Sequence, residues 1–176
     1  MLRLLFILGL LCGSIIAATL EKLSIEQMSQ KSKVIVRGQI SGCAGETRGS
    51  MIYTRCKAAV TERWKGSTPA QIEFLIPGGT AGGLIQVFTG TPKFGAGEQY
   101  VLFLWAGRSG RYQVIGLTQG AFDIKSDNKG NAVAQRAATR ELMLDASGQP
   151  VRDSDVQMTV SALRDQVNRA LGGTSK

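Results

Sequence analysis

Hydrophobic and polar residues alternate along residues 51–65 (MIYTRCKAAVTERWK), which predicts a long β-strand. Its even-numbered positions are mostly apolar. Its odd-numbered positions form a basic row, made of Tyr53, Arg55, Lys57, Arg63 and Lys65. Residues 33–41 (KVIVRGQIS) are rich in β-branched residues, so they predict a second strand that pairs with the first as an antiparallel hairpin.

The register of this hairpin follows from its two cysteines. If Cys43 lies opposite Cys56, Arg37 falls opposite Glu62, which favours a cross-strand ion pair. That register alone would put the apolar positions of the two strands on opposite faces. We therefore expect a one-residue bulge near Gly38 or Gly42 in the first strand.

Four further segments complete the predicted sheet. Residues 70–76 alternate with their apolar side chains inward, and residues 100–105 (YVLFLW) are apolar on both faces, which is typical of a buried central strand. Residues 112–117 and 121–125 predict two more strands, and the turn-rich residues 127–131 predict a hairpin after the last of them. Residues 132–150 give no clear pattern.

Two helices are expected at the ends of this β region. Ser24 and Gln27 have the spacing of a capping box, which predicts a short helix that ends near Lys31. Apolar residues recur at helical spacing near the C-terminus, which predicts an amphipathic helix over residues 160–171.

Residues 1–18 have the features of a secretory signal peptide, with one basic residue, an apolar core and a small pair at its end. Cleavage near Ala18 would leave one domain, residues 19–176, with no membrane span, in the periplasm or the medium. It would also remove Cys12. Cys43 and Cys56 would then remain in an oxidising compartment, where we expect a structural disulfide.

The chain contains no histidine, which excludes most common types of hydrolase and metalloenzyme active site. We therefore expect no catalytic residue, no cofactor and no metal site. An enzyme that uses only carboxylates such as Glu98 and Asp123 is the distant alternative. The net charge of +8 favours anionic partners or simply aids solubility.

The order of elements, with Val34–Gly38, a strand that ends in Trp64-Lys65-Gly66 and then Gly97-Glu98-Gln99-Tyr100, resembles the tissue inhibitors of metalloproteinases and the netrin-like modules. The pattern of Pro77-Gly78-Gly79, Gly82-Gly83, Gln86, Gly90-Thr91-Pro92 and Gly97-Glu98-Gln99-Tyr100 resembles a group of small, uncharacterised secreted bacterial proteins. The first resemblance implies an OB-like barrel of five to six antiparallel strands over about residues 33–136. Those inhibitors chelate zinc through an N-terminal cysteine, and cleavage near Ala18 would leave no cysteine there.

The glycine-rich crossover over residues 78–97 is long for a compact domain, which is typical of a binding element. Its candidate contact residues are Gly82, Gly83, Gln86, Phe88 and Lys93. We therefore expect an exported, non-enzymatic protein that binds a secreted or envelope protein, such as a protease. The alternative is an anionic surface polymer bound along the basic row.

Overall fold

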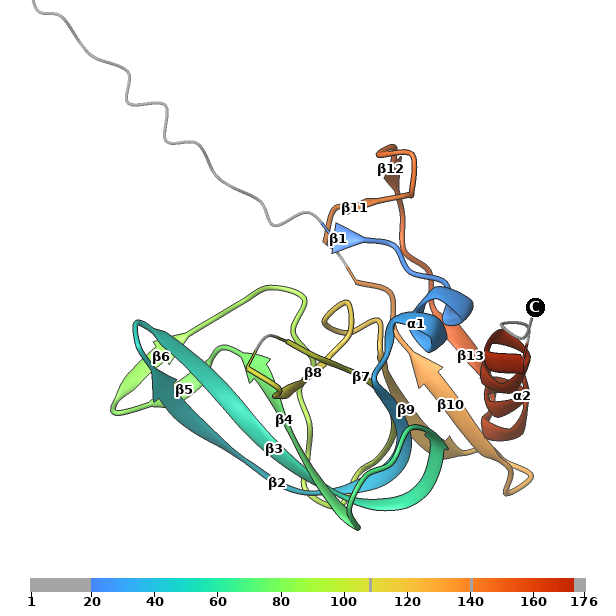
Figure 1. The fold of residues 1–176 in the computed structure, drawn as a ribbon, viewed down its shortest axis with the longest axis horizontal. Helices are drawn as coiled ribbons and strands as arrows, with labels where there is room; N and C mark the ends of the chain where they lie inside the picture. The colour runs from blue at the N-terminus through green and yellow to red at the C-terminus, as the bar shows by residue number, and fades with distance from the viewer. Residues whose placement is uncertain (1–19, 108, 140, 173–176) are drawn as a thin grey trace, which may run out of the picture.

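The computed structural model describes residues 20–107, 109–139 and 141–172, and Figure 1 shows their arrangement. The expected signal peptide over residues 1–18 lies outside the described residues. The fold is mainly β, with one short helix before the large sheet and one longer helix at its end. The expected mainly β class with two terminal helices is confirmed.

One large sheet dominates the molecule. Its eight strands are β2 (Val34–Arg48), β3 (Met51–Lys65), β4 (Gln71–Pro77), β7 (Gln99–Ala106), β8 (Tyr112–Val114), β9 (Ala121–Ser126), β10 (Ala132–Arg136) and β13 (Val156–Thr159). They are ordered β13-β10-β9-β7-β2-β3-β4-β8, and β8 also pairs with β7. The pairings β7–β2–β3–β4–β8–β7 therefore return to the strand on which they began.

The expected count of five to six antiparallel strands is wrong in two respects. The region that gave no clear pattern supplies β10, and β13 follows it, so the sheet has more strands than expected. In addition, β8 pairs with β4 in parallel, although it pairs with β7 antiparallel. Short strands such as β8 and β13 carry too few residues for a clear alternation in the sequence.

The β2–β3 hairpin has the expected register, with Cys43 opposite Cys56 and Arg37 opposite Glu62. The register shifts between Arg37 and Gly38 and again between residues 40 and 42, so bulges occur at both expected places, and a third shift follows Ile35. A Cβ on Gly38 would lie 2.7 Å from the Ala59 carbonyl oxygen, which explains why a glycine occupies this position. The strand β2 extends to Arg48, beyond its expected end.

Strand β7 separates two hydrophobic clusters, as its two apolar faces predict. Leu102 and Leu104 belong to the cluster that also contains apolar residues of β2, β3 and β4. Val101 and Phe103 belong to the cluster between the sheet and the two helices. All four side chains are fully buried.

The two helices lie side by side against the second cluster (Figure 1). Helix α1 (Ile25–Lys31) has the expected capping box between Ser24 and Gln27. Helix α2 (Val160–Gly172) buries Val160, Leu163 and Val167 in the second cluster. No helix in the described part of the chain is long and apolar enough to cross a membrane.

Two small sheets complete the fold. The crossover contains a hairpin of β5 (Gly79–Ala81) and β6 (Leu84–Gln86), so it is more ordered than the expected long loop. The other sheet joins β1 (Leu20–Glu21), β11 (Met143–Leu144) and β12 (Pro150–Val151). It ties the start of the described chain to the segment before β13.

Candidate functional site

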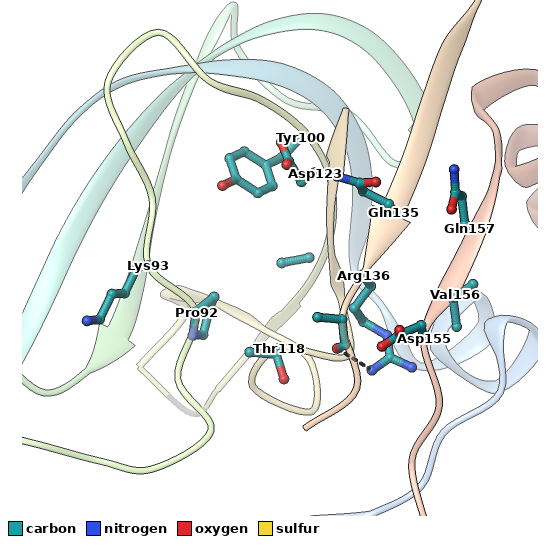
Figure 2. A pocket seen from close by; sticks show the side chains of 12 residues that line it. Pro92, Lys93, Tyr100, Thr118, Asp123, Gln135, Arg136, Asp155, Val156 and Gln157 are labelled. Atoms are coloured by element: carbon teal, nitrogen blue, oxygen red, sulfur yellow. Dashed lines mark hydrogen bonds between the residues drawn. The ribbon is translucent and has the colours of Figure 1, made fainter. Parts of the chain in front are cut away.

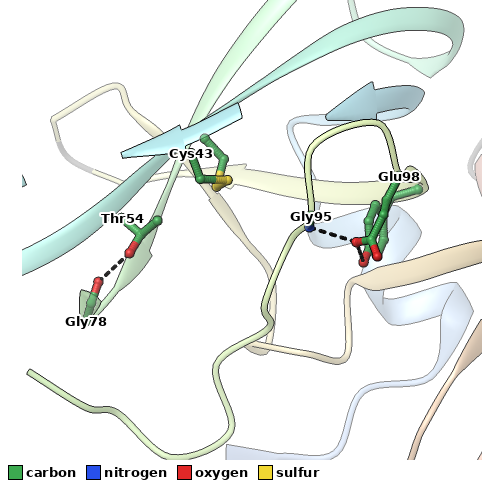
Figure 3. The surroundings of a disulfide bond; sticks show 7 residues. Cys43, Thr54, Gly78, Gly95 and Glu98 are labelled. Atoms are coloured by element: carbon green, nitrogen blue, oxygen red, sulfur yellow. Dashed lines mark hydrogen bonds between the residues drawn. A yellow bond between two sulfur atoms is a disulfide. The ribbon is translucent and has the colours of Figure 1, made fainter. Parts of the chain in front are cut away.

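Two cavities lie on either side of the crossover, and both are lined by Pro92 and Lys93. The larger, of about 480 Å³, reaches β9, β10 and β13 and is called the polar cavity (Figure 2). The smaller, of about 400 Å³, lies beside the Cys43–Cys56 disulfide and is called the disulfide cavity (Figure 3). The crossover therefore contributes to both cavities.

The candidate recognition residues fall into two groups. Gly82 and Gly83 form the turn between β5 and β6, with φ angles of +56° and +76° that suit a two-residue hairpin turn. Phe88 and Lys93 line the disulfide cavity, where Lys93 is the one charged residue in the described lining. Gln86 also lines this cavity, but its side chain has a structural role as well.

Gln86 fastens the crossover hairpin to β3. Its Oε1 accepts a hydrogen bond from the Ile52 N–H at 2.7 Å, and the Gly78 N–H donates to the Ile52 carbonyl at 2.8 Å. The Thr54 hydroxyl donates to the Gly78 carbonyl at 2.8 Å (Figure 3). These bonds hold the start and the end of the hairpin against one strand.

The backbone of β5 packs directly on β2. A Cβ on Gly45 would overlap the Thr80 carbonyl, and a Cβ on Gly79 would overlap the Thr54 hydroxyl. The hairpin therefore sits against the β2–β3 ribbon at a distance that only glycine permits at these two positions.

Three exposed apolar side chains on and beside β6 were missed by the sequence reasoning. Leu84, Ile85 and Val87 are 68%, 74% and 81% exposed. The signal was present, because a Gly-Gly pair next to short apolar runs is typical of a hairpin. Treating residues 78–97 as one glycine-rich loop concealed it.

Glu98 fixes the far end of the crossover. Its Oε2 accepts hydrogen bonds from the Gly95 N–H at 2.7 Å and from the Tyr100 hydroxyl at 2.8 Å. The Gly95 hydrogen bond, followed by the one from Tyr100, lowers the pKa of Glu98. Burial and the hydrogen bond to Glu98 raise the pKa of the Tyr100 hydroxyl. Glu98 thus acts as the acceptor that anchors this loop.

Arg55 and Lys57 of the basic row form ion pairs with glutamates. Arg55 lies 3.3 Å from a Glu46 carboxylate oxygen and 3.7 Å from one of Glu73. Lys57 lies 3.1 Å from the other oxygen of Glu73, and its hydrogen bond is the main reason that the pKa of Glu73 is lowered. Tyr53 is half-buried on the same strand.

Arg63 and Lys65 of the basic row donate hydrogen bonds to backbone carbonyls. Arg63 Nε donates to the Thr68 carbonyl at 3.0 Å. Lys65 Nζ donates to the carbonyls of Ser29 and Gln30 at 2.8 and 2.9 Å, which places a positive charge at the C-terminal end of α1. Burial is the largest cause of the lowered pKa of Lys65. The basic row is therefore largely satisfied within the protein.

Within residues 20–107, 109–139 and 141–172, no group of three or more His, Cys, Asp or Glu side chains could hold a metal ion. The two carboxylates named as candidates for an enzyme have different roles. Glu98 anchors the crossover, and Asp123 lines the polar cavity. No family model matches the sequence, and no curated protein sequence matches it significantly.

Proposed function

We propose that this chain is an exported binding protein that contacts another protein through the β5–β6 hairpin. The observation that carries the proposal is the exposure of Leu84, Ile85 and Val87 on a hairpin that is fastened at both ends. Ile85 and Val87 both line the disulfide cavity, and Leu84 directly precedes Ile85 on β6. Exposed large apolar side chains close to one another are typical of protein interaction sites. Because the hairpin is already ordered, binding would cost little further ordering of this segment.

The free edge of β6 favours a partner that binds as an extended strand. Ala81 and Leu84 flank a two-residue turn, so they form a hydrogen-bonded pair, and Ile85 in the next pair points its backbone N–H and C=O away from β5. No other backbone group in the described part of the chain bonds to Ile85. A partner strand would pair there, as in other cases of strand addition.

The chemistry of the disulfide cavity narrows the class of partner. Its lining includes Phe88, Phe94 and Ile76, with Lys93 as the charged residue. An apolar side chain with an acidic group nearby fits this lining best. We therefore infer that the partner segment is extended, apolar and acidic.

We also propose a barrel-like fold and an oxidising compartment for this protein. The ring of pairings β7–β2–β3–β4–β8–β7 supports an OB-like barrel similar to that of the tissue inhibitors of metalloproteinases, which makes a secreted protease one class of partner. The Cys43–Cys56 disulfide supports folding in an oxidising compartment such as the periplasm or the medium. A polymer bound along the basic row has less support, because four of its side chains already have partners.

The test compares the mature protein with a Leu84→Ser/Ile85→Ser/Val87→Ser variant. The wild type should capture a partner from the native envelope or medium, and the purified pair should bind about tenfold or more tightly than the variant does. Leu142→Ser is the matched control, because Leu142 is an exposed apolar residue outside the hairpin. Equal affinity of the triple variant and the control would refute the proposal.

Salt separates the two partner classes. Affinity that depends on the hairpin should fall only slightly with ionic strength, because Lys93 is the one charge it uses in the described lining. Affinity for an anionic polymer along the basic row should fall steeply.

A further inference from the structure

A row of side chains crosses four neighbouring strands at the polar cavity. Tyr100 on β7 lies opposite Asp123 on β9, which lies opposite Gln135 on β10, which lies opposite Gln157 on β13. All four line the polar cavity (Figure 2). Neighbouring strands are about 4.8 Å apart, so the row presents polar groups at that spacing along one face.

The row has unused hydrogen-bonding capacity. The amides of Gln135 and Gln157 have no hydrogen-bond partner among the described residues, and Asp123 Oδ1 is buried without one. The Thr118 hydroxyl, also in the lining, is buried and lacks a partner in the described structure. Buried groups such as Asp123 Oδ1 and the Thr118 hydroxyl are unfavourable when unbonded, so a ligand that bonds to them would gain affinity. Gln157 is exposed and Gln135 is half-buried, so their amides are open to a ligand.

The charges around the cavity are largely balanced. Asp123 Oδ2 lies 3.1 Å from the Lys125 ammonium, and the Arg136 guanidinium is paired with the buried Asp153. Lys93 and Asp155, which complete the charged lining among the described residues, have opposite signs. A neutral ligand therefore fits better than an anion or a cation.

The lining also offers apolar surface. The Tyr100 ring is held edge-on by Phe94, with 4.7 Å between ring centroids, and its hydroxyl is fixed by Glu98. Pro92 faces the cavity from the crossover and Val156 from β13 (Figure 2). A suitable ligand thus has C–H surface as well as many hydroxyl groups.

We propose that the polar cavity binds a neutral saccharide, with the ring against Tyr100 and Pro92 and its hydroxyls bonded to Asp123, Gln135 and Gln157. Carboxylate oxygens accept hydrogen bonds from hydroxyls, and amides both donate and accept, so this row matches the alternating groups along a sugar edge. The volume of about 480 Å³ is within the usual range for a small-molecule site and accommodates one or two sugar rings.

The test is a titration of the isotopically labelled mature protein with glucose, N-acetylglucosamine, cellobiose and maltose, followed by NMR. At least one of these sugars should shift the side-chain amide signals of Gln135 and Gln157 with millimolar affinity. The variants Gln135→Ala and Gln157→Ala should each weaken that binding several-fold and leave the thermal midpoint unchanged, because neither amide makes an internal hydrogen bond. Gln71→Ala, an exposed glutamine on β4, is the matched control.

Three outcomes would overturn the proposal. These are no amide shift with any of the four sugars, shifts that map outside the polar cavity, and equal sugar affinity in the two variants and the control. Tighter binding of inorganic phosphate than of any sugar would also overturn the inference that the ligand is neutral. The hairpin variant should keep its sugar binding, so failure here and failure of the proposed partner binding are separate results.

Discussion

The polar side chains at the two ends of the large sheet differ in whether they have partners within the protein. On the β2–β3–β4 side, the basic row and its glutamates bind one another or nearby carbonyls, and a disulfide joins two of the strands. On the β9–β10–β13 side, Gln135, Gln157 and an oxygen of Asp123 have no partner in the described structure. The side that is richer in charge is thus the less available for binding.

This difference teaches that charge in a sequence is a poor guide to a binding surface. Paired side chains stabilise the fold, but a ligand must replace their existing partners before it can use them. Unpartnered groups carry a cost of about 1–3 kcal/mol each when they are buried, and a ligand can remove that cost. Asp123 Oδ1 and the Thr118 hydroxyl are such buried groups, and the amides of Gln135 and Gln157, which have no partner in the described structure, lie beside them in the polar cavity.

The largest expected effect comes from the buried ion pair of Arg136 and Asp153 on the β9–β10–β13 side. The side chains of Arg136 and Asp153 are almost fully buried, and Arg136 Nη2 lies 3.0 Å from Asp153 Oδ1. Burial alone would raise the pKa of Asp153, but hydrogen bonds from Arg136 and the Thr139 N–H outweigh it and keep the pKa lowered.

Replacing Arg136 with Met leaves the Asp153 charge buried and unpaired. We expect the free energy of unfolding to fall by about 3–5 kcal/mol, measured by urea denaturation. The double variant Arg136→Met/Asp153→Leu should recover much of that loss, because it removes both charges. If Arg136→Met were as stable as the wild type, the Arg136–Asp153 ion pair would not stabilise this part of the sheet.

The next effect concerns the disulfide of the β2–β3–β4 side. The double variant Cys43→Ser/Cys56→Ser should lose about 3 kcal/mol of unfolding free energy, because the bridge restricts the unfolded chain, while the far-ultraviolet circular dichroism keeps its β character. Reduced wild-type protein is the control and should show the same loss. Two free thiols in the intact protein, counted by non-reducing mass spectrometry, would contradict the assignment.

A smaller effect is expected at Glu62, which joins the basic side to α2. Its carboxylate accepts from Trp64 Nε1 at 2.9 Å and from Arg37 at 2.8 Å, and Arg164 lies 3.5 Å away. The Trp64 hydrogen bond, helped by Arg37 and Arg164, lowers the pKa of Glu62. A lowered pKa means that its contribution to stability is fully present above the ordinary glutamate pKa and is lost as the pH falls through the folded value.

We therefore expect Glu62→Gln to cost about 1 kcal/mol at neutral pH, since the group is partly exposed, and to flatten the loss of stability below about pH 5. Thermal unfolding between acid and neutral pH measures both. Lys57→Gln, which removes an exposed ion pair, is the control and should cost less than Glu62→Gln. Parallel pH curves for Glu62→Gln and wild type would refute the assignment.

The sequence predicts those parts of the fold in which local pattern and long-range register agree. The alternation over residues 51–65 and the conflict of parity with residues 33–41 are enough to predict the hairpin and its bulges. The capping box at Ser24 and the apolar spacing of α2 are equally local signals.

The candidate sites are harder to predict because their residues meet only through tertiary structure. Tyr100 and Gln157 are far apart in the sequence, and strand pairing through Asp123 and Gln135 brings them into one row. No local pattern encodes that row. For the basic row, the sequence correctly indicates one face of a strand but carries no sign of the glutamates and carbonyls that occupy it.

The contact between Gly45 and Thr80 also bears on how relatives of this chain can be recognised. A side chain at position 45 would push the crossover hairpin off the β2–β3 ribbon. The exposed residues of the hairpin can vary without disturbing its seat, whereas this position must stay without a side chain wherever the hairpin is seated in the same way. A glycine at this place in β2 is therefore a marker of the seated hairpin that does not depend on which residues the hairpin displays.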